Sequence, residues 1–243
     1  MNIDNRLPAL VDGPPPATID DVLAVMEQID LSLADGDGVK WFNRLYWKTT
    51  LAVRSGPPST SWEDPAGLAL LDVVFAAYYF QAVRDWYADP EHIARAWRPL
   101  FANRGSSGVT RIQFALCGMN AHINHDLPLA LVETCRRLGS APADGGALHH
   151  DYERVNGVLD VVETQVKQEF ATGLVGIAAD GLGRSGDAAA MWSIRSARET
   201  AWDNALVLWS LKDMPMLRNP FLMSLDRLVG LAGQGMVLPQ IVG

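Results

Sequence analysis

The sequence has little charge and few cysteines for its length. Of its 243 residues, 20% are charged and two are cysteines, while 49% are hydrophobic. Apolar content this high excludes a disordered acidic tail, and the length fits about one or two domains. The formal net charge of −8 argues against a nucleic-acid-binding surface, which needs clustered Lys and Arg, and against binding to an anionic membrane surface. We therefore expect neither nucleic acid nor membrane among its partners.

Targeting and membrane-spanning segments are also missing from the sequence. The N-terminus has no basic region followed by an apolar stretch, so no signal peptide is expected. The longest apolar run, residues 73–80, is far shorter than the roughly 20 residues of a membrane helix. Cys117 and Cys135 are expected on one helical stretch about 27 Å apart, too far for a disulfide. These absences predict a cytoplasmic protein with two reduced cysteines.

The alternating pattern of strands is absent, and helical spacing of apolar residues replaces it. Thr18 is a good N-cap for the first long helix, and Pro128 is expected to kink or split a later one. The expected helices cover residues 18–34, 39–54, 66–87, a short stretch after Pro90, 110–138, 149–171, 187–211 and 222–231. We predict an extended N-terminal arm over residues 1–17 and one all-α domain over residues 18–243. This domain would be a single bundle of about seven to nine helices.

Most catalytic signatures are absent as well. There is no Gly-rich phosphate loop, no G-x-S-x-G elbow, no C-x-x-C or H-E-x-x-H pattern and no di-iron set of Glu and E-x-x-H residues. Gly181, Gly183 and Gly186 fit a dinucleotide-binding pattern in letters only, because no strand precedes them. Any chemistry must therefore depend on polar residues set within the apolar helices.

One segment has an unusual combination of polar and apolar residues: residues 118–131, Gly-Met-Asn-Ala-His-Ile-Asn-His-Asp-Leu-Pro-Leu-Ala-Leu. It resembles the most specific motif of a family of unknown function in actinobacteria and fungi. Residues 37–46 resemble the N-terminal signature of this family, and residues 71–75 and 195–202 fit it too. The resemblance spans most of the chain and implies a cytoplasmic helical protein. It supplies no established reaction, so the site has to be argued from the residues.

The segment from residue 111 to 126 carries two polar stripes on an apolar helix. Asn120 and Asn124 lie within about 40° of each other, and His122 and Asp126 form the second stripe. His122 and Asp126 are four residues apart, so the carboxylate can orient the imidazole as a general acid or base near pH 7. The alternative is that both stripes only hydrogen-bond neighbouring helices.

Asp72 is the only charged residue between Ala66 and Gln81. A buried carboxylate without a partner is costly, so Asp72 is expected to be paired or protonated. Tyr79 lies seven residues further along the same face. The alternative is that Asp72 faces solvent on a narrow edge or caps another helix. In the first interpretation, Asp72 is a further catalytic residue.

A third candidate region is the helix that carries Arg195, Glu199 and Trp202 on one face. The simpler explanation is an Arg–Glu pair packed under tryptophans. The alternative is that Arg195 or Arg198 binds a substrate carboxylate or phosphate, or pairs with one of the two aspartates above. Further residues at the edges of apolar stripes would line the same pocket: Asn43, Tyr46 and Asn156.

A metal site is a rival use of the His and Asp residues. The His-Asp doublet at residues 125–126 resembles part of the H…HD…D pattern of metal-dependent phosphohydrolases. Residues 149–151 form a second His/Asp cluster. The signal is weak, because neighbouring residues point about 100° apart on a helix. The metal, such as zinc, would have these ligands: His122, His125, Asp126 and Asp151.

The leading hypothesis is an enzyme that acts on a small, largely apolar organic molecule, such as a secondary metabolite. It would transfer protons without a cofactor, as a cyclase, isomerase, dehydratase or other lyase, using His122, Asp126 and Asp72. The expected substrate-binding residues are Asn43, Tyr46, Tyr79, Asn120, Asn124, Asn156, Arg195, Arg198 and Trp202. The alternatives are a metal-dependent hydrolase and a non-catalytic helical binding or scaffold protein. Tryptophans on the surface would indicate a homodimer interface. The alternative is that the eight tryptophans of the chain belong to the core.

Overall fold

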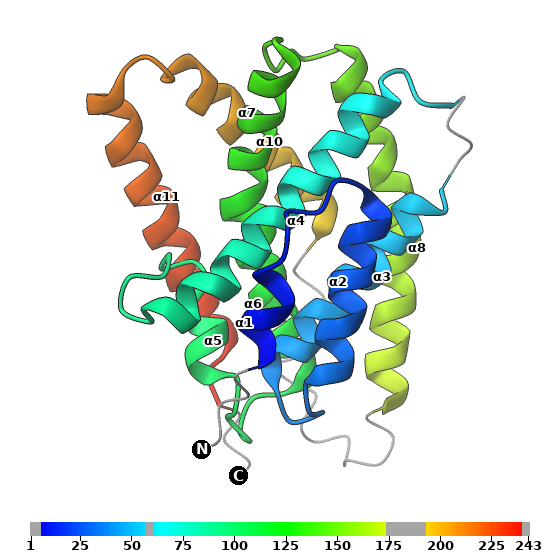
Figure 1. Ribbon diagram of the computed structural model, residues 1–243, viewed down its shortest axis with the longest axis vertical. Helices are drawn as coiled ribbons and strands as arrows, with labels where there is room; N and C mark the ends of the chain where they lie inside the picture. The colour runs from blue at the N-terminus through cyan, green and yellow to red at the C-terminus, as the bar shows by residue number, and fades with distance from the viewer. Residues whose placement is uncertain (1–5, 57–60, 174–192, 240–243) are drawn as a thin grey trace.

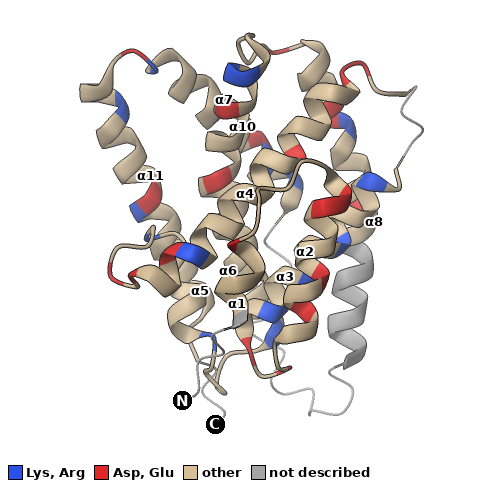
Figure 2. Ribbon diagram, in the orientation of Figure 1, with Lys and Arg blue, Asp and Glu red and all other residues tan. Residues whose placement is uncertain are grey.

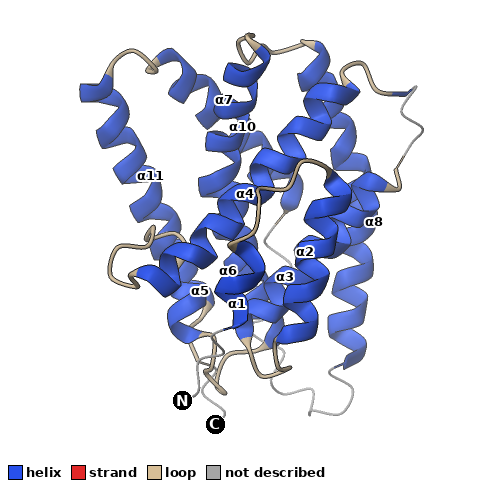
Figure 3. Cartoon of the chain, viewed as in Figure 1, coloured by secondary structure: helices blue, strands red, loops and turns tan. Residues whose placement is uncertain are grey.

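The computed structural model describes residues 6–56, 61–173 and 193–239, and these residues form helices and no strands (Figure 1) (Figure 3). The expected all-α multi-helix bundle is therefore confirmed. Figure 2 shows charged residues of both signs interspersed along the helices. The elements in chain order are α1 (Arg6–Val11), α2 (Ile19–Ser32), α3 (Gly38–Arg54), α4 (Pro65–Ala88), α5 (Arg98–Asn103), α6 (Arg111–Ala121), the π-helix η2 (His122–Asp126), α7 (Leu127–Leu138), α8 (Ala147–Gly173), α10 (Ile194–Ser210) and α11 (Pro215–Met236).

Two helices begin with a capping box, in which a side chain and a main-chain N–H exchange hydrogen bonds. At the start of α2, Thr18 Oγ1 accepts from the N–H of Asp21 at 3.1 Å, and Asp21 Oδ2 accepts from the N–H of Thr18 at 2.9 Å. Thr110 and Gln113 make the same exchange at the start of α6. The sequence-based N-cap at Thr18 is confirmed.

Two expectations for the shorter segments are wrong. The predicted extended arm is in part a helix, α1, because Leu7 and Val11 are buried against the core. The short helix expected directly after Pro90 is α5, and it begins only at Arg98. Asp89 instead holds the intervening turn by accepting hydrogen bonds at both carboxylate oxygens.

The last helix is longer than its apolar pattern predicted. α11 begins at Pro215, whose missing N–H costs nothing in the first turn, and it continues through Pro220. The helix expected from residue 187 is observed from Ile194, behind the N-cap Ser193. The break expected at residues 181–186 lies outside the described residues.

The expected kink in the stretch 110–138 is a π-helix. The main-chain N–H of Leu127 donates to the carbonyl of His122, five residues back, and Pro128 follows in the first turn of α7. Pro128 has no N–H to extend the preceding α-helical ladder, so the widened turn accommodates it. The two polar residues predicted for catalysis, His122 and Asp126, form the two ends of this turn.

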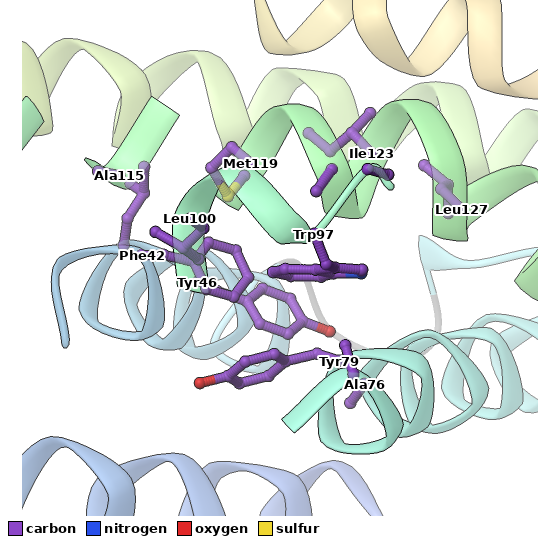
Figure 4. Packing of buried hydrophobic residues seen from close by; sticks show 14 of the residues in the cluster. Phe42, Tyr46, Ala76, Tyr79, Trp97, Leu100, Ala115, Met119, Ile123 and Leu127 are labelled. Atoms are coloured by element: carbon purple, nitrogen blue, oxygen red, sulfur yellow. The ribbon is translucent and has the colours of Figure 1, made fainter. Parts of the chain in front are cut away.

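The helix formed by α6 and η2 runs through the middle of the bundle. It contacts α3, α4, α5, α7, α10 and α11. Gly118 faces the ring of Phe42, and a Cβ at this position would overlap that ring, so α3 and α6 cross in close contact. Figure 4 shows Phe42, Tyr46, Tyr79 and Trp97 gathered beside this helix. Cys117 and Cys135 are both free, as expected, and both are buried.

The helix α4 is the one helix of the described chain that is long and apolar enough to cross a membrane. Its most apolar stretch has a mean hydropathy of 1.6, and 50% of that stretch is buried in the bundle. Central helices of helical bundles meet the same criterion, so this property is weak evidence for a membrane segment.

Candidate functional site

Asp126 is the centre of a buried hydrogen-bond network. Its Oδ2 accepts from Nε1 of Trp97 and from Nδ1 of His122, both at 3.0 Å, and its Oδ1 accepts from Nδ1 of His125 at 2.8 Å. Burial raises the pKa of Asp126, but the hydrogen bonds from His122 and His125 outweigh this effect and leave the pKa below its ordinary value. Asp126 is therefore an ionised carboxylate inside the bundle.

This carboxylate determines which nitrogen of His122 carries the hydrogen. An ionised carboxylate only accepts hydrogen bonds, so neutral His122 is protonated at Nδ1 and has its lone pair on Nε2. Nε2 is buried and has no hydrogen-bond partner in the described structure. Burial lowers the pKa of His122 more than Asp126 raises it, which keeps the imidazole neutral at pH 7. The result is a desolvated base with a free lone pair.

Aromatic rings enclose this imidazole on several sides. Phe75 of α4 stacks face to face on His122 with ring centroids 3.6 Å apart, and Tyr46 of α3 meets it edge-on at 4.4 Å. Phe42 and Trp97 lie further out, at 5.8 and 5.9 Å. His122 is consequently 0% exposed, so no solvent reaches Nε2 in this conformation.

Asp72 lies on the wall of a pocket of about 500 Å³ at the start of α4. The residue is partly exposed, but its Oδ2 is buried without a hydrogen-bond partner. Burial raises the pKa of Asp72 to about 7, against the opposing effect of the positive charge of Arg198. The remaining wall is mixed. Its apolar residues are Ile19, Val53, Trp62, Pro65, Leu68 and Ala69, and residues 54–56, Arg-Ser-Gly, add polar surface.

Tyr46 contacts the imidazole of His122 and lies within electrostatic range of Asp72. Its ring contacts His122, and its hydroxyl hydrogen-bonds the side chain of Thr50. Burial raises the pKa of Tyr46 well above its ordinary value, and the negative charge of Asp72 raises it further. Asp72, Tyr46, His122 and Asp126 therefore lie in one region between α3, α4 and η2.

The expected asparagines bind neighbouring helices. Nδ2 of Asn120 donates to a main-chain carbonyl of α11 at 3.0 Å, and Nδ2 of Asn124 donates to Oδ1 of Asn120 at 3.1 Å. Nδ2 of Asn43 donates to a main-chain carbonyl of α2 at 2.8 Å, and its Oδ1 accepts from the hydroxyl of Tyr79 at 3.3 Å. These contacts favour the interpretation in which the first polar stripe joins helices.

Arg198 belongs to a second buried cluster that joins α8 and α10. Its Nε donates to Oδ1 of Asn156 and its guanidinium donates to the main-chain carbonyl of Tyr152, both at 2.7 Å. The same guanidinium lies 3.9 Å from the ring centre of Tyr152. Of the interpretations open for Arg198, these contacts favour one in which it joins helices; its positive charge also lowers the pKa of Asp72, but the described structure has no ion pair between the two.

The other residues expected from α10 lie apart from this region. Arg195 forms a 2.6 Å ion pair with Asp160 on the exposed surface of α8. Nε1 of Trp202 donates to Asp144 at 2.7 Å, and its ring packs on Tyr152. Neither contact involves Asp72 or His122.

The four expected metal ligands are not gathered in one place. His122 and His125 both bond to Asp126, whereas Asp151 accepts hydrogen bonds from the main-chain N–H groups of residues 63 and 64 at the start of α4. In the described part of the chain, no group of three or more His, Cys, Asp or Glu side chains is arranged to hold a metal ion.

Sequence reasoning did not identify three residues around His122, His125 and Asp126. Phe75 lies three residues after Asp72, so helical spacing could have placed it on the same face. Trp97 lies in an irregular turn, and no periodic pattern identified it. Asp226, the only acidic residue of α11, accepts from the N–H of Ala96 and lies 3.7 Å from Nε2 of His125.

Comparison with known proteins places the chain in a family. No curated protein and no solved structure shows significant similarity to it. One family model matches residues 19–239, which include every helix from α2 to α11. The chain therefore belongs to DUF5995, a family of unknown function.

Proposed function

We propose that this protein is an enzyme that transfers protons on a small, largely apolar organic molecule bound at Asp72. The observation that carries the proposal is a pair of buried polar atoms without partners, Oδ2 of Asp72 and Nε2 of His122. Both groups lie near Tyr46: the imidazole of His122 contacts its ring, and the negative charge of Asp72 raises its pKa. Buried polar atoms normally have hydrogen-bond partners, and a catalytic role is one explanation of an exception. The described residues include four such atoms: those of Asp72 and His122 belong to acid–base groups, and the other two are Nε of Arg98 and Oγ1 of Thr134.

Asp72 is the group that meets the substrate first, because it forms part of the pocket wall. With a pKa of about 7, it exists in both protonated and ionised forms near neutral pH. A carboxyl group in this state can donate a proton to a substrate and recover it in the same turnover. The apolar residues around it favour a hydrocarbon-rich substrate.

His122 is the complementary base. Asp126 holds the imidazole in the tautomer that leaves Nε2 free, and burial keeps it neutral. A substrate atom reaches Nε2 only after Phe75 moves away from the imidazole face. An acid and a base on two sides of one substrate support isomerisation, dehydration or cyclisation, which need proton addition at one atom and removal at another.

The test is proton exchange in deuterated water. Small terpenoid, polyketide and aromatic alcohols and ketones are screened by thermal shift, and the compounds that bind are incubated with the protein in D₂O. We expect deuterium at carbon positions of the bound compound or of its product, measured by mass spectrometry. Asp72→Asn and His122→Ala should lower the rate by roughly 100-fold or more while keeping the helical circular dichroism. Asp160→Asn, a surface carboxylate in an ion pair, is the matched control.

A non-catalytic binding or scaffold protein is the second candidate. The observation that favours it is that Asn43, Asn120, Asn156 and Arg198 are all hydrogen-bonded within the protein. In that case the same compounds bind without deuterium exchange in any variant, which contradicts the enzymatic proposal. Loss of folding in His122→Ala, together with unchanged exchange in Asp72→Asn, would also contradict it.

A further inference from the structure

One side of α11 is apolar and faces solvent. This helix contacts α5, α6 and η2, and its buried residues Val229, Gly230 and Gly233 all lie in its C-terminal half. Figure 1 shows its N-terminal half leaning away from the other helices. Seven Leu and Met side chains on α11 and its flanks are between 52% and 88% exposed: Met214, Met216, Leu217, Met223, Leu228, Leu231 and Leu238. Leu217, Leu228 and Leu231 lie within about 60° of one another around α11, whereas Met216 and Met223 lie about 100–120° away from Leu217. The three aligned leucines mark an interaction surface, unlike single exposed apolar residues.

The exposed face has the spacing of a helix–helix seam. Leu217, Phe221, Ser224, Leu228 and Leu231 are separated alternately by four and three residues. This is the heptad spacing of the positions that face a partner helix in a coiled coil. Phe221 is partly buried and the other four residues are exposed, so no described helix of the chain covers the seam. We refer to these five residues as the α11 seam.

The α11 seam is symmetric about its centre. Leu217 and Leu231 each lie seven residues from Ser224, and Phe221 and Leu228 lie three and four residues from it. Two antiparallel copies related by a twofold axis at Ser224 would place Leu217 opposite Leu231 and Phe221 opposite Leu228. The small serine would lie at the crossing point, where two helices approach most closely. A twofold interface requires a surface that is complementary to itself, and the seam meets this condition.

The charge of α11 also suits a second copy of this chain. Its charged residues are Arg218, Asp226 and Arg227, two basic and one acidic, whereas the whole chain has a net charge of −8. Figure 2 shows α11 mostly uncharged along its length. Two acidic molecules therefore meet here with little repulsion between like charges. An anionic membrane is a poorer partner, because it attracts clusters of basic residues and repels a chain of this charge.

The apolar surface of the α11 seam is that of a small interface. Its three exposed leucines and Phe221 present on the order of 350 Å² of apolar surface per copy, so pairing would bury on the order of 700 Å² from these side chains, and the residues that flank them add to this area toward the roughly 1,000 Å² at which specific interfaces begin. We propose that two copies of this chain associate through the α11 seam as an antiparallel dimer. The seam lies outside the pocket at Asp72, so the dimer does not depend on the proposed activity.

Sedimentation velocity of the full chain over the micromolar range tests the dimer. We expect a dimer for the unmodified protein and a monomer for the double variant Leu217→Glu, Leu228→Glu, with unchanged helical circular dichroism because both side chains are exposed. Leu31→Glu is the matched control, since Leu31 is a 72% exposed leucine on α2, and it should remain dimeric. A wild-type monomer throughout the range, or a dimer in the double variant, overturns the proposal. Binding of that monomer to phosphatidylcholine vesicles would assign the face to a membrane.

Disulfide cross-linking tests the orientation. Ser224→Cys should cross-link to a second copy of itself on mild oxidation. Leu217→Cys should not cross-link to itself, but it should cross-link to Leu231→Cys when the two variants are mixed. Self-cross-linking of Leu217→Cys would show a parallel pair and overturn the antiparallel arrangement. The native cysteines are buried and should not contribute.

Discussion

Asp126 and Asp72 both carry carboxyl groups inside the same bundle, yet their pKa values are shifted in opposite directions. Asp126 receives hydrogen bonds from three side chains, and its pKa stays below the ordinary value despite burial. Asp72 has a buried oxygen without a partner, and burial raises its pKa to about 7. The number of donors around each carboxylate therefore determines its charge at neutral pH, and burial alone does not. In this arrangement one aspartate organises a base and the other is available as an acid.

The largest effect on stability is expected from removing Asp126, the carboxylate that accepts hydrogen bonds from three side chains. Asp126→Ala leaves the N–H groups of Trp97, His122 and His125 without their acceptor inside the protein. We expect a loss of about 3–5 kcal/mol in the free energy of unfolding, measured by urea denaturation. Asp160→Ala, which breaks a surface ion pair, should remain close to wild type. Equal stability of the two variants would show that the network around Asp126 contributes little.

Replacement of Asp72 is expected to change the stability in the opposite direction. Its folded-state pKa is raised to about 7, so the folded protein binds more protons than the unfolded chain between about pH 4 and pH 7. The stability of the wild type that depends on protonated Asp72 is present below this window and is lost as the pH rises through it. Asp72→Asn should therefore stabilise the protein by up to about 4 kcal/mol at pH 8 and have little effect near pH 4. Destabilisation at pH 8 would show that Asp72 has a favourable partner.

The sequence predicted this pair of aspartates from their surroundings. Asp72 stood alone in an apolar helix, and Asp126 stood four residues after His122, so burial and pairing followed from helical spacing. The all-α fold and the helices around both residues were predicted in the same way. The roles of Asn43, Asn120 and Asn156 could not be predicted, because their partners lie on helices distant in the sequence and the crossing of helices determines them. The π-helix at residues 122–126 was missed because periodicity assumes regular turns.

Trp97 and Phe75 illustrate a second limit of the sequence. The contact of Trp97 with Asp126 joins residues 29 positions apart through an irregular turn, which no spacing rule describes. Phe75 shares a face with Asp72, but its stacking on His122 depends on how α4 crosses η2. Burial of a polar residue is therefore more predictable than the identity of its partner.

A smaller effect is expected from removing the positive charge of Arg198. Arg198 is the cation that opposes the raised pKa of Asp72. Arg198→Met should raise the pKa of Asp72 further and leave Asp126 ionised. Carbon-13 NMR of the labelled aspartate carboxyl groups measures both values. An unchanged midpoint for Asp72 would separate Arg198 from the site.

The smallest effect is expected outside both regions. Arg195 pairs with Asp160 where both side chains are exposed, and it does not contact Asp72 or His122. Arg195→Ala should leave both the urea midpoint and the rate of deuterium exchange at wild-type values. A clear loss of exchange in this variant would return Arg195 to the substrate-binding role that its sequence position suggested.

The most direct test of the difference between the two aspartates is their titration in one sample. Carbon-13 NMR of the wild-type protein, with resonances assigned through Asp72→Asn and Asp126→Asn, should show Asp72 titrating near pH 7 while Asp126 remains ionised down to below pH 4. Titration of Asp72 together with exposed aspartates near pH 4 would contradict the account, because the carboxyl group at the pocket would then have no proton to donate at neutral pH.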